Sequence, residues 1–391
     1  MRRRLWDTIK SMHSYVHKRR PTLKKKINTT QRSELARAPR RQRSPIVGVD
    51  VSNKNSHYCV LGPEGEIAAE GTLRTTPAGF SAQFPRAIRC RIVLEVGTHS
   101  PWINRLLHSL GHEVIVANAG RVRMIYDNDN KNDRVDARTL ARLARVDAGL
   151  LHPIRHRSAE AQADLAVLHA RDSLVSLRTK LVNTVRSMVK SFGSRLLSSS
   201  PEYFPRKVRT HIPASLQPAL FPLLDQMEML TSQIHAYDKQ VEQLTRTRYP
   251  KTQVIQQIRG VGALTSLAFV LTIDDPHRFQ KSRDVGSYLG LRPRRDDSGQ
   301  SRPQLSITKA GNQFLRRLLV NCAQYTLGHF GMDSDLRRWG QALMARGGKN
   351  AKKRAVVAVA RKLAVLMHSL WVNGEVYEPL RRPVHAQEAA A

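Results

Sequence analysis

The sequence has little cysteine and no cysteine arranged for cross-linking or metal binding. Only three cysteines occur in 391 residues, Cys59, Cys90 and Cys322, and none forms a CxxC pair or a mixed Cys/His ligand motif. A disulfide framework is therefore excluded, and the pattern argues against a structural zinc site. We expect three reduced thiols in a cytoplasmic, nucleoid-associated protein.

The sequence also lacks a long uninterrupted apolar run. The best stretch, residues 355–372, contains Arg361 and Lys362, and a membrane-spanning helix needs about 20 predominantly apolar residues. The N-terminus, Met1-Arg-Arg-Arg, has no apolar segment of the signal-peptide kind. We expect no membrane partner.

Acidic residues are scarce relative to basic ones, and the imbalance is uneven along the chain. The 65 Lys and Arg outnumber the 31 Asp and Glu, so the formal charge is +34. This indicates a polyanionic partner, DNA or RNA. Residues 1–44 carry +13, residues 45–148 only +2, and residues 149–391 the remaining +19. The first segment is typical of a mobile basic arm, whereas the nearly neutral segment either packs like an ordinary domain or keeps its acids for a metal.

Residues 45–148 show strands followed by alternating helices and strands. Apolar runs at 46–51, 57–61 and 66–74 are separated by turn residues and predict a three-strand meander. Helices are then expected near 78–88, 101–110 and 134–146, with strands at 91–95 and 113–117. This order is that of an RNase H-like (RuvC-like) fold, so the fold class is α/β plus all-α.

The remainder is predicted to be helical. Apolar residues follow helical spacing from Leu165 to Phe192, and Leu220 to Leu244 form a near-heptad seam. The seam favours an antiparallel hairpin or a dimeric coiled coil over residues 149–250, although two helices buried in one domain remain an alternative. Residues 251–378 form a third, basic helical unit, and 379–391 are expected to be a disordered tail.

Four acids in the neutral segment form a candidate metal site. Asp50 lies in the middle of an apolar strand, between Val49 and Val51, and Glu95 ends a second one. The first and fourth strands lie side by side in an RNase H-like sheet, so we expect these two acids to converge, and a buried carboxylate needs a cation. Asp133 and Asp136 lie three residues apart, on one face of a helix start. Such a set suits two Mg²⁺ ions, with Mn²⁺ possible, about 4 Å apart, a clamp for phosphoryl transfer. An ordinary N-terminal helix pair is the alternative for the two aspartates.

Ser298 lies in a polar loop rich in cations. Such cations could hold a phosphate against the serine hydroxyl, although most Ser-Gly pairs are only turns. Upstream, Gly260-Val-Gly262 predicts a turn between two helices whose backbone N–H groups suit a phosphate; a plain turn is the alternative. The basic residues around the serine are Arg292, Arg294, Arg295, Lys309, Arg316 and Arg317.

Several of these segments, in order, resemble the DEDD-type insertion-sequence transposases that include the Piv invertase and the bridge-RNA-guided recombinases. The resemblance spans about residues 45–378. The segments that carry it are Ile46-Val-Gly-Val-Asp50, Val93-Leu-Glu95, Lys131-Asn-Asp-Arg-Val-Asp136, Ile258-Arg-Gly-Val-Gly262, Tyr288-Leu-Gly-Leu-Arg-Pro293, Ser298-Gly299, Ile307-Thr-Lys-Ala-Gly-Asn312 and Ala358-Val-Ala-Arg-Lys-Leu363. The arm before Asp50 is longer than that pattern, and the residues after Glu95 depart from it.

The resemblance implies a DNA recombinase. It places a metal site on Asp50, Glu95, Asp133 and Asp136, and it makes Ser298 a nucleophile that holds DNA covalently. It also implies a homodimer or tetramer whose active site combines two subunits, and an element-encoded guide RNA as partner. From the residues alone, a RuvC-like metal-dependent nuclease without serine chemistry, a non-catalytic nucleic-acid-binding protein and an actin-like ATPase remain alternatives.

Overall fold

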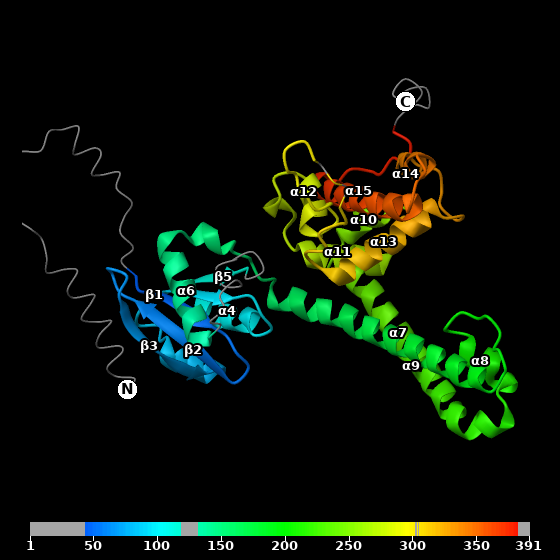
Figure 1. Cartoon of the computed structure of the whole chain (residues 1–391), viewed down its shortest axis with the longest axis horizontal. Coiled ribbons are helices and arrows are strands. Elements are labelled where there is room, and N and C mark those ends of the chain that lie inside the picture. The colour runs from blue at the N-terminus through cyan, green and yellow to red at the C-terminus, as the bar shows by residue number, and fades with distance from the viewer. Residues whose placement is uncertain (1–43, 119–131, 302, 304, 382–391) are drawn as a thin grey trace, which may run out of the picture. The chain divides into compact units, whose positions relative to one another are not determined.

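The computed structural model describes residues 44–118, 132–301, 303 and 305–381, which fall into two compact units divided between His156 and Arg157 (Figure 1). The predicted arm lies outside the described residues up to position 43, and so does the predicted tail from position 382. Residues 379–381 of that tail are ordered, because the Asp335 N–H donates to the Pro379 carbonyl and the Arg381 N–H donates to Asp335 Oδ2.

The first unit contains a five-stranded sheet with the order β3-β2-β1-β4-β5. β1 pairs antiparallel with β2 and parallel with β4, so the expected meander and the expected neighbourhood of the first and fourth strands are both confirmed. The strands are β1 (Ile46–Asp50), β2 (Asn55–Leu61), β3 (Ile67–Arg74), β4 (Arg91–Glu95) and β5 (Glu113–Ala117).

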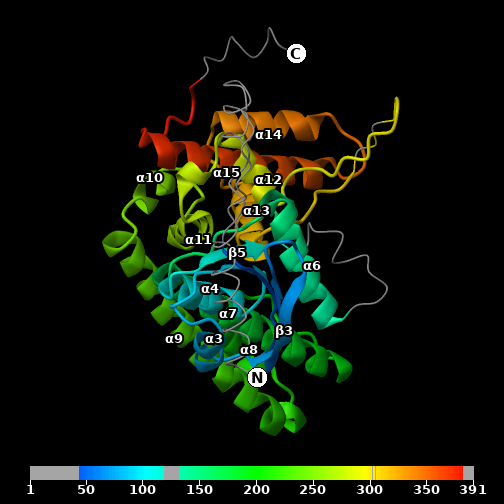
Figure 2. The same cartoon turned by 90° about the vertical axis from the view of Figure 1, so that its left-hand side faces the viewer.

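Helices cover both faces of this sheet, with α3 (Pro77–Gln83) and α4 (Ser100–Ser109) on one and α6 (Asp133–Val146) on the other (Figure 2). Alternate strand residues supply the two cores, as the period of two requires. Val47, Val49, Ile92 and Leu94 lie in the α3/α4 core, and Ile46, Cys59, Leu61 and Val93 lie in the α6 core. The helix expected to reach residue 88 ends at Gln83, before Pro85.

In the part of the chain described, the second unit is built from helices, apart from isolated β-bridges in the loop between residues 293 and 307. The region 149–250, expected as one separate segment, is divided: residues 149–156 belong to the first unit, and a hydrophobic core joins the start of α7 and the end of α9 to residues 255–371. Its helices are α7 (Ala159–Ser191), α8 (Phe204–Val208), α9 (Gln217–Thr247), α10 (Thr252–Gln256), α11 (Ala263–Ile273), α12 (Arg283–Tyr288), α13 (Gln313–Leu327), α14 (Asp335–Ala345) and α15 (Ala351–Asn373).

The near-heptad apolar seam of α9 packs against α7, another helix of the same chain. Figure 1 shows α7 and α9 side by side as a long hairpin with α8 at its far end. Leu220, Leu224 and Met227 are buried against Val185 and Val189 of α7. At the base of the hairpin, Arg248 and Tyr249 donate hydrogen bonds to the buried Asp164 carboxylate. The hairpin alternative is therefore the one observed for this seam.

Helix α15 is the one described helix whose length and composition would allow it to cross a membrane. Its apolar residues instead belong to the core of the second unit, including Val359, Leu363 and Met367. Lys362, one of the two cations that interrupt it, lies over the Trp339 ring of α14 at 4.3 Å from the centroid. It is the central helix of a packed bundle.

Candidate active site

Asp50 and Glu95 end two adjacent parallel strands. The β1–β4 register pairs Val49 with Leu94, so the two acids are the next residues along each strand, and both are half-buried. Carboxyl ends of parallel strands meet at one edge of a sheet, the usual place for a ligand in α/β proteins. The predicted pairing of the two strands is confirmed, whereas Asp50, expected in the middle of its strand, is the last residue of β1.

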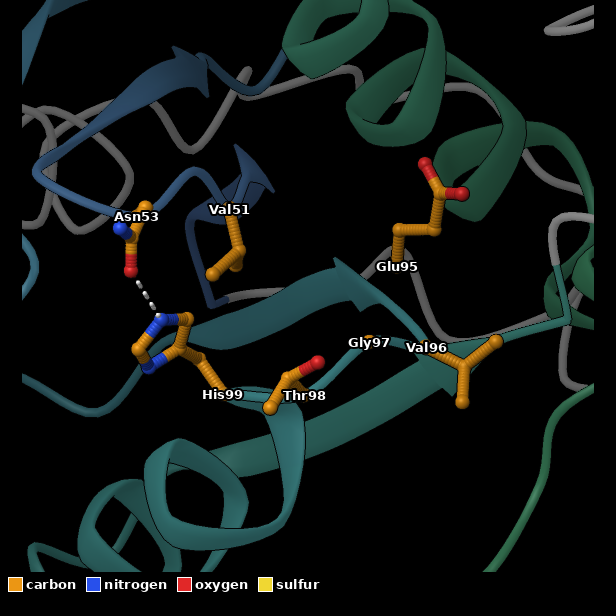
Figure 3. Close-up of a pocket in the computed structure, with 7 residues that line it drawn as sticks. All are labelled: Val51, Asn53, Glu95, Val96, Gly97, Thr98 and His99. Atoms are coloured by element: carbon orange, nitrogen blue, oxygen red, sulfur yellow. Dashed lines mark hydrogen bonds between the residues drawn. The ribbon is translucent and has the colours of Figure 1, made fainter. Parts of the chain in front are cut away.

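Both acids also point to the face covered by α6. Residues 46 and 48 face α6 while 47 and 49 face the opposite core, so the alternation places Asp50 on the α6 face, and the same count on β4 places Glu95 there. In Figure 3 the Glu95 carboxylate points away from His99, toward that helix. Gly48 allows the close approach, since a Cβ there would lie 2.0 Å from the Ala137 carbonyl oxygen of α6.

The first turn of α6 brings the other two acids to this edge. The Asn132 side chain caps the helix by accepting the Arg134 N–H, and Asp133 and Asp136 occupy the first turn, where the helix dipole favours negative charge. Asp136 is 5% exposed, on the sheet-facing side with Ala137 and Leu140. Asp133 is more exposed and lies 3.8 Å from Nε2 of His57.

A fifth acid, Glu70 of β3, holds α6 in place. Its carboxylate is 8% exposed and accepts hydrogen bonds from Arg134 and Arg138, with Arg134 Nε at 2.9 Å and Arg138 Nη2 at 2.7 Å. The Arg138 hydrogen bond is the main reason that the pKa of Glu70 falls to about 2. Because both arginines lie in the first two turns of α6, this clamp orients the helix start that carries Asp133 and Asp136.

The four predicted acids fit a divalent cation by donor type and by their shared face. Carboxylate oxygens are the ligands that Mg²⁺ and Mn²⁺ prefer. In the described residues no three His, Cys, Asp or Glu side chains already stand in an arrangement that could hold a metal ion. The backbone therefore brings the acids to one edge, and their side chains would have to converge around an ion.

A pocket opens beside Glu95 at the same edge. Its walls are Glu95, the loop 96–99 after β4, and Val51 and Asn53 after β1 (Figure 3). Within it, His99 Nε2 lies 3.2 Å from Asn53 Oδ1, and the Trp102 indole N–H donates to His99 Nδ1 at 3.1 Å.

Ser298 lies in the second unit, at the tip of an exposed two-stranded turn. Bridges join Pro293 to Ile307 and Ser298 to Ser301, and the backbone reverses at Gly299, whose φ is +55°. Residues 292–301 are exposed, and in Figure 2 they belong to the yellow segment that extends away from the bundle. The expected polar loop is observed.

The predicted cations around this loop differ in what they contact. Arg316 is half-buried and donates to the carbonyls of Leu289 and Ala310, and Arg317 pairs with Asp172 of α7 at 2.5 Å. These two are engaged within the fold. Arg317 is nevertheless exposed, as are Lys309 and the three arginines before the serine, Arg292, Arg294 and Arg295.

Two glycines of the second unit, Gly290 and Gly311, mark close backbone approaches. A Cβ on Gly290 would lie 2.0 Å from the Ala310 carbonyl oxygen, and one on Gly311 would lie 2.2 Å from that of Tyr288, so the segments around 290 and 311 touch backbone to backbone. The turn at Gly260 and Gly262 lies between α10 and α11 as predicted. Gly260 has φ +90° and lies under the Tyr325 ring. Gly262 precedes α11.

His57, Glu70, Asn53 and His99 were absent from the predicted site. A signal existed for the first two, because His57 and Glu70 lie on strands whose alternation places them on the α6 face. The pairing register that aligns His57 with Asp50 and Glu70 with Cys59 is long-range, and local sequence does not reveal it.

Comparison with known proteins matches both units to transposases. A family model described as "Transposase", for the DEDD domain of IS110 elements, matches residues 47–193, and the model "Transposase IS116/IS110/IS902 family" matches residues 252–338. Together they cover more than half of the chain and contain every predicted site residue.

Relatives extend over most of the chain. The transposase for insertion sequence element IS1111A of Coxiella burnetii is 28% identical over 85% of this chain and 91% of its own length. The transposase for insertion sequence element IS1328 of Yersinia enterocolitica is 24% identical over 85% of this chain and 98% of its own length. The pilin gene-inverting protein of Moraxella bovis is 27% identical over only 37% of this chain. The DEDD domain implies the use of a divalent metal. The chain belongs to the IS110/IS116 family of insertion-sequence transposases.

Proposed function

We propose that this transposase cuts and rejoins DNA with a divalent-metal site on Asp50, Glu95, Asp133 and Asp136 and with Ser298 as nucleophile. The observation that carries the proposal is the shared edge: two strand ends and one helix start bring four carboxylates to one face of the sheet. Mg²⁺ is the expected ion, with Mn²⁺ as an alternative. When bound, it would stabilise charge that develops on the phosphate during phosphoryl transfer.

Ser298 would attack the scissile phosphate and remain joined to one DNA end. An incoming DNA hydroxyl would then displace the serine, so the number of phosphodiester bonds is conserved. Support comes from the exposed position of Ser298 at the loop tip and from the exposed cations Arg292, Arg294, Arg295 and Lys309 near it in sequence, which suit a phosphate. Arg316 and Arg317 hold α13 in place, and the turn at Gly260 and Gly262 offers a further phosphate contact.

Two variants test this assignment. Asp50→Asn should abolish cleavage and joining of DNA carrying the element ends, because it weakens the metal site. Ser298→Ala should abolish joining and any covalent protein–DNA product that survives denaturation. Joining by Ser298→Ala in Mg²⁺ would leave a RuvC-like nuclease as the function, and full activity of Asp50→Asn in cells would leave a non-catalytic nucleic-acid-binding role.

We also propose that an element-encoded RNA guides the enzyme and that it acts as a homodimer or tetramer. The excess of +19 over residues 149–391 suits RNA as well as DNA. For assembly, an exposed apolar stripe lies on α7 and the residue that follows it, outside the seam that packs on α9. Its members are Leu177, Met188 and Phe192, which are 51%, 44% and 58% exposed. Sequencing RNA that copurifies with the protein tests the first part, and bulk cellular RNA without enrichment of sequence flanking the gene would contradict it.

A further inference from the structure

The pocket beside Glu95 contains a hydrogen-bonded chain whose direction can be assigned. The Trp102 indole N–H can only donate, so His99 Nδ1, its partner at 3.1 Å, must accept. The neutral ring then carries its proton on Nε2, which donates to Asn53 at 3.2 Å. The Asn53 atom that faces this proton must be the amide oxygen, as Figure 3 shows.

This chain orients the Asn53 amide. Its oxygen is engaged by His99, and its –NH₂ group is left as the pair of donors that the residue offers to the surroundings. Asn53 is exposed at the pocket wall, close to the exposed Thr98. Val51 and Val96 add apolar surface to the same pocket. In such a mixed site the oriented polar groups fix the orientation of a ligand, and the two valines can contact the face of a planar one.

We propose that this pocket binds the DNA base next to the scissile phosphate and that Asn53 is a specificity-determining residue for that base. The inference rests on the proposed metal site, because Glu95 belongs both to that site and to the pocket wall. A phosphate held at the carboxylates would place its neighbouring nucleotide in the pocket. DNA is the occupant because DNA is the strand that a transposase cuts.

The orientation of Asn53 predicts which bases are preferred. Guanine presents O6 and N7 and thymine presents O4 as acceptors, whereas adenine and cytosine place an amino donor at the equivalent position. Asparagine usually recognises adenine through its oxygen and nitrogen together. With the oxygen held by His99 and the –NH₂ group outward, a keto base, guanine or thymine, should be favoured.

Sequencing of junctions tests the proposal with the full-length protein. Element ends are flanked by randomised bases in a plasmid library, and joined products are sequenced after expression in cells. The wild type should favour G or T over A or C at one position beside the cleaved bond by about 5-fold or more, since one good base contact gives ~1–3 kcal/mol of discrimination. Asn53→Ala should reduce this preference to under about twofold. Asn53→Asp, which only accepts, should reverse it.

Asn55→Ala is the matched control, because Asn55 is equally exposed two residues away at the start of β2 and outside the pocket. If an Asn53 variant cannot join DNA, binding of junction oligonucleotides that differ at that base gives the same comparison, measured by gel shift in Mg²⁺ with Ser298→Ala added to both proteins so that no joining occurs.

The two proposals fail in different ways. Continued joining by Asp50→Asn would overturn the metal site. Loss of joining in Asp50→Asn, together with an Asn53→Ala base profile identical to wild type in both assays, would overturn only the base pocket.

Discussion

At the scale of single residues, the carboxylate of Glu70 shows how a buried ion pair holds the helix that carries two of the predicted site acids. It is almost fully buried at the sheet edge, where an unpaired charge would be costly, and two arginines of α6 neutralise it. The hydrogen bond from Arg138 holds the pKa of Glu70 at about 2, against an ordinary 4.5. Glu70 is thus a positioning residue for the helix that carries Asp133 and Asp136.

Glu70→Gln should lower the free energy of unfolding by about 2 kcal/mol at pH 7, since it removes charge-assisted hydrogen bonds. A depressed pKa contributes stability that is fully present above pH 4.5 and is lost as the pH falls toward 2. The gap between wild type and variant should therefore be constant above about pH 4.5 and shrink below it, in urea denaturation followed by tryptophan fluorescence.

The control is Glu113→Gln at the opposite edge of the sheet. Glu113 pairs with Arg91 at 2.8 Å but is 46% exposed, so its loss should cost less than about 1 kcal/mol. An equal effect of the two substitutions would mean that burial of Glu70 contributes nothing.

At the scale of elements, the contact between β1 and α6 sets where the acids meet. Gly48 is the point of closest approach between β1 and α6. Its neighbours Val47 and Val49 point to the opposite face of the sheet, so the helix can lie directly against the strand at Gly48. A side chain there would displace the helix backbone, because no flexible group can move out of the way. The glycine therefore serves the geometry of the site as well as the packing.

Gly48→Ala should destabilise the protein by about 1–3 kcal/mol, the usual range for overpacking, and should weaken Mg²⁺-dependent activity because Asp133 and Asp136 move with α6. Gly97→Ala is the control for stability, since a Cβ there meets nothing within 4 Å. Thermal unfolding of both variants measures the difference, and an unchanged Gly48→Ala melting temperature would contradict the close packing.

The stripe on α7 predicts the surface used for self-association. The double change Leu177→Lys and Met188→Lys should convert a dimer into a monomer, because it places charge in the middle of the stripe. Thr179→Lys, exposed on the same helix but outside the stripe, should leave the mass unchanged. Light scattering after size-exclusion chromatography gives the masses, and a dimer that survives the double change would place the interface elsewhere.

At the scale of the whole molecule, the net charge differs strongly between segments of the chain. The unit that carries the carboxylates is nearly neutral between residues 45 and 148, while the arm holds +13 and the rest +19. A neutral unit can gather acids around a cation without a strong background field, and the basic segments supply attraction to phosphates. The net charge thus indicates a polyanionic partner, and its distribution along the chain indicates which segments attract phosphates and which one carries the acids.

Deletion of residues 1–43 should weaken DNA binding equally for unrelated sequences and reduce the dependence of log K on log salt, because fewer counterions are released. Fluorescence anisotropy between 50 and 200 mM salt, the range over which such contacts lose most affinity, measures this slope. An unchanged slope would show that the arm makes no phosphate contacts.

The sequence alone determined the strand meander, the two strands that carry Asp50 and Glu95, the acidic helix start and the polar loop with Ser298. It placed Asp50 within its strand, whereas the structure ends β1 at this residue. These follow from local alternation, turn residues and helix-start preferences, which act over a few positions. It also predicted α7 and α9 as helices, because the 3.6-residue period is local.

Only the tertiary structure decided which groups surround these residues. Strand register and chain reversal bring Glu70, His57 and Asn53 to the site. The apolar seam of α9 packs against α7 of the same chain. Arg316 and Arg317, which sequence could not tell from free phosphate contacts, are held by backbone carbonyls and Asp172. The Asn53–His99, Glu70–Arg138 and Arg317–Asp172 contacts join residues 46, 68 and 145 positions apart, since contact distance in a folded chain is not distance along the sequence.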